Sequence, residues 1–186
     1  GFVPELKECH LESRHLGLVM PDEVENLQEQ VNLLAETLQK TLDFEKILAI
    51  AEGAEELSGK MPEVLRKVTE SEAAAKVRAA KPILAVAKDE AFCFFYRDNL
   101  ELLASLGAKI EYFSPLSDAE PPKNTDGFLF CGGYPELHAK TLSENKTMLA
   151  SIRQAVQAGL PTAAECGGFL YLGRSLEDAD GKAWPM

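Results

Sequence analysis

One junction in the chain reads Ala163-Ala164-Glu165-Cys166-Gly167-Gly168, where an apolar run from Leu160 gives way to a helical pattern from Phe169. Small residues lie two positions before and two positions after Cys166. This is the spacing of a sharp strand-to-helix turn, in which backbone packs closely on backbone and the side chain between is exposed at the sheet edge. The pattern predicts that Cys166 is a nucleophile; the alternative is a structural cysteine before a glycine turn.

Residues 81–186 alternate between strand and helix patterns, and the strands are continuous apolar runs. Such runs indicate a parallel sheet that helices cover on both faces. We therefore predict an α/β fold: a doubly wound, mainly parallel, flavodoxin-like sheet with strands in the order 2-1-3-4, preceded by a helical segment. The expected strands are 83–87, 109–113, 127–131 and 160–165, and the expected helices are 99–106 and 143–158.

A second glycine pair, Gly132 and Gly133, follows the third expected strand. Sites in parallel sheets lie at the carboxyl ends of the strands, so this pair is expected near Cys166. Paired glycines allow the backbone to turn an N–H group into a crevice, as an oxyanion hole requires, and the N–H of Gly167 would be the other donor. Tyr134 and Glu136 could orient a small polar substrate. The alternative is a tight connection to a helix that Glu136 merely caps.

Residues 1–80 have a mostly helical pattern. A helix is expected over 21–40 with one apolar face, a second over 44–51 with Asp43 as its cap, and a connector over 53–80 that contains a helix from 71 to 80. The apolar face of the first helix needs a cover, so pairing with a second copy as a homodimer is one expectation. The apolar positions on that face are Val24, Leu27, Val31, Leu34, Ala35 and Leu38.

The net charge of −11 argues against nucleic acid or an anionic membrane as a partner, and no apolar run is long enough to span a bilayer. The four cysteines, widely spaced, are expected to be free thiols in a reducing cytoplasm. Cys9, His10 and His15 lack a second ligand pair at zinc spacing, so no metal site is expected. Cys93 and Cys131 lie in apolar runs and are expected in the core.

Several motifs together resemble the cobyrinic acid a,c-diamide synthase family, and they cover nearly the whole chain in order. The residues that carry the resemblance are 85–96, 99–103 and 113–118, the two glutaminase-like signatures at 132–138 and 164–168, and, from the end of the synthetase domain, 14–18 and Asp43. The resemblance implies a domain division of 1–52 as the end of a synthetase domain, 53–80 as a connector, and 81–186 as a glutaminase domain.

The resemblance also implies an activity, that of a cytoplasmic ligase of cobalamin biosynthesis. Such an enzyme uses ATP and magnesium to activate the a and c carboxylates of a cobyrinic acid-type corrinoid. Its class I, triad-type glutaminase domain releases ammonia from glutamine. Cys166 would form the glutamyl thioester, and the glycine N–H groups would bind the oxyanion.

Two departures from the family pattern lead us to expect a part of a longer protein that is inactive alone. No phosphate loop of the form G-x-x-x-x-G-K-[ST] occurs, so no ATP or magnesium site is expected in this chain. No histidine follows Cys166, and His138 reads as a solvated helix residue rather than a base. Two alternatives stay open: a stand-alone cysteine hydrolase or chaperone-like protein, and a non-catalytic interaction domain that keeps a glutaminase-like fold.

Overall fold

The computed structural model describes residues 1–10, 19–57 and 59–186. Contacts between Cα atoms divide the chain into two units, Gly1–Lys60 and Met61–Met186, and each is described by itself. The division falls inside the expected connector, and the functional limits 1–52, 53–80 and 81–186 stay predictions. Residues 14–18 of the family resemblance, His15 included, lie outside the described residues.

The first unit contains a 3-10 turn and two helices: η1 (Pro21–Glu23), α1 (Leu27–Thr41) and α2 (Phe44–Glu52). The prediction of one helix over 21–40 was wrong at its start. Val24 has an extended backbone and Asn26 a left-handed one (φ 55°), so the chain breaks between the turn opened by Pro21 and α1. Asparagine tolerates this conformation better than most residues, and a β-branched valine favours the extended one.

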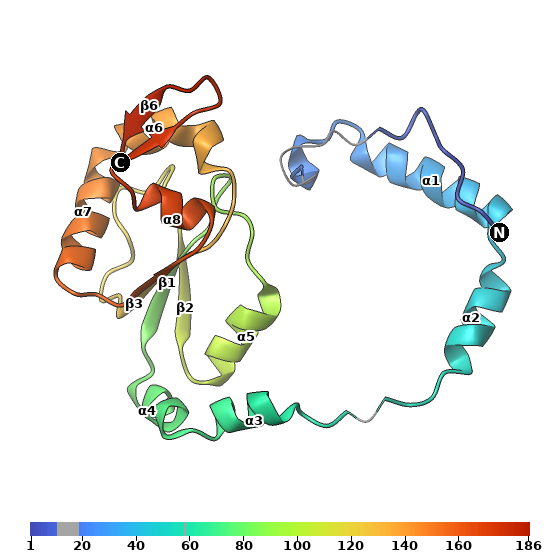
Figure 1. Cartoon of the computed structure of the whole chain (residues 1–186), viewed down its shortest axis with the longest axis horizontal. Coiled ribbons are helices and arrows are strands. Elements are labelled where there is room, and N and C mark those ends of the chain that lie inside the picture. The colour runs from blue at the N-terminus through green and yellow to red at the C-terminus, as the bar shows by residue number, and fades with distance from the viewer. Residues whose placement is uncertain (11–18, 58) are drawn as a thin grey trace. The chain divides into compact units, whose positions relative to one another are not determined.

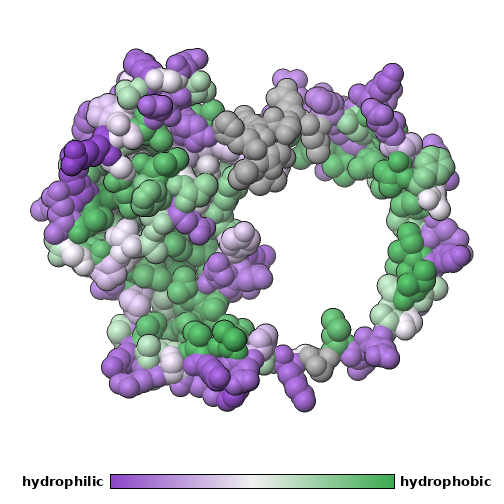
Figure 2. Space-filling model, viewed as in Figure 1, coloured by the Kyte–Doolittle hydropathy of each residue, from purple (hydrophilic) through white to green (hydrophobic). Residues whose placement is uncertain are grey.

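The apolar face of α1 is open within the first unit. Val31, Leu33 and Leu34 are each more than a third exposed, and Figure 2 shows hydrophobic surface along the elements of this unit. Pairing of this face with a second copy stays a prediction. The cap of α2 is confirmed, because the Asp43 carboxylate accepts a hydrogen bond from the Lys46 N–H at 3.0 Å.

The second unit begins with two helices, α3 (Glu63–Thr69) and α4 (Glu72–Ala80). The helix expected over 71–80 is confirmed as α4, whose first turn is capped by the Ser71 hydroxyl, which accepts from the Ala74 N–H at 3.1 Å. The shorter helix α3 was not predicted.

The sheet of the second unit has the predicted order, β2-β1-β3-β4, and all of its pairs are parallel. The strands are β1 (Ile83–Ala87), β2 (Lys109–Phe113), β3 (Gly127–Phe130) and β4 (Thr162–Ala164). Helices α5 (Arg97–Ser105) and α7 (Lys146–Gln157) flank the sheet on opposite sides (Figure 1). This confirms the doubly wound α/β fold. The last two strands are shorter than expected, because Cys131 and Glu165 already belong to the loops at the sheet edge.

The core of this unit forms around an aromatic cluster. The rings of Phe113, Phe128 and Phe130 lie with centroids 5.6–6.0 Å apart. Residues 85–87 of β1 are fully buried, which explains why this central strand is apolar on both faces rather than alternating. Cys131 is buried as expected, whereas Cys93 is half-buried. In the described part of the chain, no helix combines the length and the apolar character that crossing a bilayer requires.

The helix expected over 143–158 is instead two helices, α6 (Ala139–Glu144) and α7, with a break at Asn145. The Asn145 side chain explains the break. Its Oδ1 accepts from the Met148 N–H, and its Nδ2 donates to the carbonyls of Pro115 and Asp118, both at 2.8 Å. The side chain therefore ends one helix, caps the next and holds the loop after β2.

The chain continues from the sheet through the short helix α8 (Gly167–Tyr171) into an antiparallel hairpin. The apolar run at 183–186 forms β6 (Ala183–Pro185), which pairs with β5 (Ser175–Glu177). The Asp178 carboxylate closes the hairpin by accepting from the indole N–H of Trp184 and the backbone N–H of Lys182.

Candidate active site

Cys166 occupies a strained turn between β4 and α8. Its backbone has φ 49° and ψ −121°, a combination that non-glycine residues rarely adopt and that is enriched at functional sites. The thiol is exposed. The end of β4 is held in place by a hydrogen bond of 3.1 Å from the Glu165 N–H to the Phe130 carbonyl. The predicted strand-to-helix turn is thus present, with the cysteine presented at its apex.

The two glycines after Cys166 are required by close packing. A Cβ atom on Gly168 would lie 2.4 Å from the Phe130 carbonyl oxygen, and one on Gly167 would lie 2.6 Å from Cδ of Pro135. Because neither neighbour can move without shifting β3 or the loop after it, only glycine fits at either position. The sequence pattern therefore reflects a real steric limit at the turn.

The Gly132-Gly133 loop lies beside Cys166, as predicted. A Cβ atom on Gly132 would lie 3.4 Å from Cβ and 3.7 Å from Sγ of Cys166. The Gly133 carbonyl oxygen lies 3.2 Å from the corresponding position on Gly167. The ends of β3 and β4 therefore bring the nucleophile candidate and the three predicted oxyanion-hole glycines into one cluster.

The three glycines differ in how free their N–H groups are. Gly132 forms an isolated antiparallel bridge with Phe94, whose N–H donates to the Gly132 carbonyl at 3.0 Å. In such a pair each residue turns its N–H and carbonyl toward the other, so Gly132 faces Phe94. Among the described residues, none of the three N–H groups donates to a backbone acceptor with good geometry, but the bridge directs that of Gly132 toward Phe94. The N–H groups of Gly133 and Gly167 belong to no such bridge and are the ones available to a bound ligand.

The side chains proposed to orient the substrate lie differently. Tyr134 is buried, and its ring packs edge-on against Phe94 with centroids 5.1 Å apart. Glu136 is half-buried in the first turn of η2 (Pro135–His138), and His138 is half-buried at its last position. The Tyr134 ring is therefore part of the packing, and a role of Tyr134 or Glu136 in orienting a substrate stays a prediction.

Two of the cavities lined by described residues lie in the second unit. One of about 320 Å³ adjoins the turn before Cys166, and Glu165, Cys131 and Tyr96 are among its lining residues. Burial, and to a lesser degree the charge of Glu165, raises the pKa of the Cys131 thiol, which makes that cysteine a poor nucleophile.

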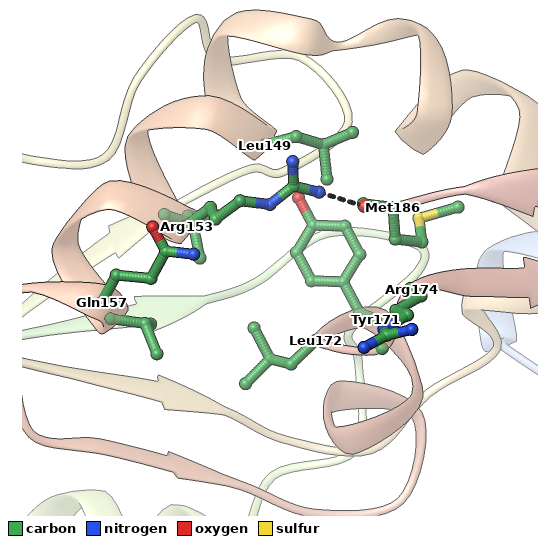
Figure 3. A pocket seen from close by; sticks show the side chains of 10 residues that line it. Leu149, Arg153, Gln157, Tyr171, Leu172, Arg174 and Met186 are labelled. Carbon is green, nitrogen blue, oxygen red and sulfur yellow. Dashed lines mark hydrogen bonds between the residues drawn. The ribbon is translucent and has the colours of Figure 1, made fainter.

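The other cavity, of about 560 Å³, lies between α7, α8 and the end of β6 (Figure 3). The Arg153 guanidinium donates to the Met186 carbonyl across it. Its lining includes none of the predicted site residues. In the described ranges 1–10, 19–57 and 59–186, no group of three or more His, Cys, Asp or Glu side chains is arranged to hold a metal ion.

The turn 89–94 after β1 also belongs to the site, although no residue in it was assigned a role from the sequence. It contacts the glycine loop through Ala91 and Phe94. The only sequence signal was its position at the end of a strand, because the contact joins residues about forty positions apart.

Comparison with known proteins agrees with this geometry. Residues 83–186 match the family described as the CobB/CobQ-like glutamine amidotransferase domain. The chain is 39% identical over 180 residues to a cobyrinate a,c-diamide synthase of Clostridium tetani, covering 97% of this chain and 38% of that protein. It is 38% identical over 186 residues to the enzyme of the same name from Caldanaerobacter subterraneus, covering 100% of this chain and 38% of that protein. It is 37% identical over 195 residues to a third enzyme of this name, from Fusobacterium nucleatum, covering 100% of this chain and 41% of that protein.

The chain thus spans about two fifths of the length of these curated relatives. The resemblance inferred from the motifs is confirmed, and among the three readings that the sequence left open the comparisons support the amidotransferase. With the matched residues covering the sheet, the Gly132-Gly133 loop and Cys166, the chain belongs to the CobB/CobQ-like glutamine amidotransferase family.

Proposed function

We propose that this chain contributes the glutaminase site of an enzyme that amidates the a and c carboxylates of a cobyrinic acid-type corrinoid. The observation that carries the proposal is the juxtaposition of an exposed cysteine in a strained turn with two free backbone N–H groups. The names of the relatives supply the corrinoid acceptor. The four widely spaced cysteines, none of them in a disulfide in the described part of the chain, are in keeping with a cytoplasmic enzyme.

The proposed reaction begins when the Cys166 thiolate attacks the carboxamide carbon of glutamine. The carbonyl becomes a tetrahedral oxyanion, which accepts hydrogen bonds from the N–H groups of Gly133 and Gly167. Collapse of this intermediate breaks the carbon–nitrogen bond and releases ammonia, once the nitrogen has been protonated, and leaves a glutamyl thioester on Cys166. Water then attacks the thioester through a second oxyanion, which yields glutamate and restores the thiol.

The loop geometry favours Gly133 over Gly132 as the donor on this side of the site. Gly132 has its backbone turned toward Phe94, with which it forms a β-bridge. Preorganised backbone donors need no reorganisation during the reaction, and the loss of one such donor typically costs about 10²–10³ in kcat. Glu136 would contact the polar end of the bound glutamine.

ATP and magnesium would supply the activation of the corrinoid carboxylates in the whole enzyme. The sequence has no phosphate loop, so we assign no residue of this chain to either group. We also assign no general base within it. Because nucleophile, base and oxyanion donors act as a unit, we propose that the chain alone has negligible glutaminase turnover.

The proposal is tested by Cys166→Ala in the full-length enzyme. Glutamine-driven amidation should be lost, whereas amidation from added ammonium salts should stay near the unmodified rate, because the corrinoid site is separate. Cys9→Ala, at a half-buried cysteine of the first unit, is the matched control and should leave both reactions near their normal rates. A Cys166→Ala enzyme that still used glutamine would overturn the proposal.

A further inference from the structure

A single carboxylate organises the turn that follows β1. Oδ1 of Asp89 accepts hydrogen bonds from the N–H groups of Ala91 at 2.9 Å and Phe92 at 3.1 Å. Oδ2 accepts from the Ser114 hydroxyl at 2.8 Å and the Leu116 N–H at 3.0 Å. The carboxylate therefore closes its own turn and ties that turn to the segment after β2.

This turn is the surface on which the glycine loop rests. A Cβ atom on Gly133 would lie 2.1 Å from the Ala91 carbonyl oxygen and 3.0 Å from Cα of Phe92. Ala91 and Phe92 are both fully buried, so neither can move aside. The position of the Gly133 backbone, and with it the direction of its N–H, therefore depends on where the turn is held.

The contact continues along the chain. The Phe94 N–H donates to the Gly132 carbonyl at 3.0 Å, and Gly132 in turn lies against Cys166. A continuous set of contacts thus runs from the Asp89 carboxylate through residues 91–94 to the glycine loop and the thiol.

The same turn also contacts the helix that carries the second donor. The Phe92 ring packs edge-on against Tyr171, with centroids 5.2 Å apart, and Tyr171 ends the short helix α8 that Gly167 begins. Burial raises the pKa of Tyr171, and the negative charge of Asp89 raises it further. The turn therefore touches both elements that present N–H groups to the site.

We propose that Asp89 is a positioning residue of the glutaminase site: through the 89–94 turn it fixes the two backbone donors that bind the oxyanion. The inference rests on the proposed function and deepens it. Asp89 contacts no reacting atom in this account. It acts on catalysis only through the placement of Gly133 and Gly167.

The chemistry of the site explains why a carboxylate is needed there. Four donors converge on Asp89, and an ionised carboxylate offers acceptor sites only. In Asp89→Asn the amide NH₂ would face two of these donors, so the turn must shift to avoid the clash. An oxyanion hole tolerates little displacement, since its donors must lie about 2.7–3.1 Å from the oxyanion.

The test compares three rates in the full-length enzyme carrying Asp89→Asn. We expect kcat of the glutamine-driven reaction to fall about 10- to 100-fold with little change in KM, as for a partly displaced oxyanion donor. Ammonia-driven amidation should stay near the unmodified rate. Alkylation of Cys166 by iodoacetamide should also keep its rate, because that displacement of iodide forms no oxyanion and needs only an accessible thiolate.

Asp126→Asn is the matched control. The Asp126 carboxylate accepts from the Ile83 N–H at 2.8 Å at the opposite end of the same strand. This variant should lower stability somewhat and leave the glutamine-driven kcat near normal.

Two results would overturn the role of Asp89: an Asp89→Asn enzyme with normal glutamine turnover, or a loss of Cys166 alkylation as large as the loss of turnover. If Asp89→Asn does not fold, Ser114→Ala removes one of the four donors and should give the same pattern with a loss of several-fold; normal turnover there would count against the proposal. The proposed function is judged separately, by whether Cys166→Ala still uses glutamine.

Discussion

The two units of the chain reach their structures by different means. In the second unit, residues 85–87 of the central strand are fully buried, and a cluster of phenylalanines closes the core around them. In the first unit, α1 and α2 contain no buried residue in the described part of the chain, and Leu48 is 59% exposed. The sheet unit is therefore stabilised by its own hydrophobic core, whereas the helical unit leaves an apolar face exposed.

The largest expected effect tests this difference in the core. Phe130 is fully buried and its ring contacts four other aromatic rings. Phe130→Ala should lower the free energy of unfolding by about 3–5 kcal/mol, because it removes buried apolar area and leaves a cavity. Leu34→Ala, on the open face of α1, should cost less than about 1 kcal/mol. Denaturant unfolding followed by circular dichroism measures both. Similar losses for the two variants would mean that the α1 face is covered in solution.

A smaller effect is expected at the glycines. Gly168→Ala should cost about 1–3 kcal/mol and distort the turn at Cys166, because its new methyl group meets the Phe130 backbone. Gly59→Ala is the matched variant in the first unit, where nothing lies within 4 Å of the added methyl group. It should leave the melting temperature unchanged. A neutral Gly168→Ala would show that β3 and the turn are not in close contact.

Sequence reasoning was most successful where local pattern and tertiary packing agree. The bounds of β1 and β2, the strand order and the turn at Cys166 were all predicted, because buried parallel strands and a glycine-flanked turn leave few alternatives. The juxtaposition of Cys166 with the Gly132-Gly133 loop followed from the rule that parallel strands end at one edge.

Two of the misses share a long-range cause. From the sequence, Asn145 is indistinguishable from an ordinary helix residue. Only the structure shows that its side chain donates to the carbonyls of Pro115 and Asp118 after β2. For Asp89 the sequence indicates only that it follows a strand. Its hydrogen bonds with Ser114 and Leu116 join residues 25 and 27 positions apart, which no local pattern predicts. The break before α1 has a local cause: the left-handed backbone of Asn26 interrupts a sequence pattern that otherwise predicts one continuous helix.

The cysteines give a reactivity test of the same contrast. Cys166 is exposed in the second unit, Cys9 is half-buried in the first, and Cys131 is buried with a raised pKa. Iodoacetamide at neutral pH should therefore label Cys166 first and Cys131 last, as measured by peptide mass spectrometry over time. Equal rates would identify Cys166 as an ordinary structural thiol.

The smallest expected effect concerns acid and the β5–β6 hairpin. Hydrogen bonds from Trp184 and from the Lys182 backbone hold the pKa of the Asp178 carboxyl below its usual range. A lowered folded-state pKa means that the stabilisation is present above the usual carboxyl range and is lost as the pH falls through the folded-state value. Trp184 is the only tryptophan in the chain, so its fluorescence reports on the hairpin.

The corresponding variant, Asp178→Asn, should shift the Trp184 emission toward that of a solvated indole at neutral pH and remove the acid-dependent change. An unaltered acid transition in this variant would place the titrating group elsewhere.

The central claim is that Cys166 carries the glutamyl group during turnover. The direct measurement is mass spectrometry of the peptide containing Cys166 after the full-length enzyme is mixed with glutamine and quenched in acid, which preserves thioesters. We predict a glutamyl adduct on Cys166 that forms during turnover and disappears when glutamine is exhausted. Sustained glutamine-driven turnover with no adduct, or with the adduct on Cys9, Cys93 or Cys131 instead, would contradict the assignment.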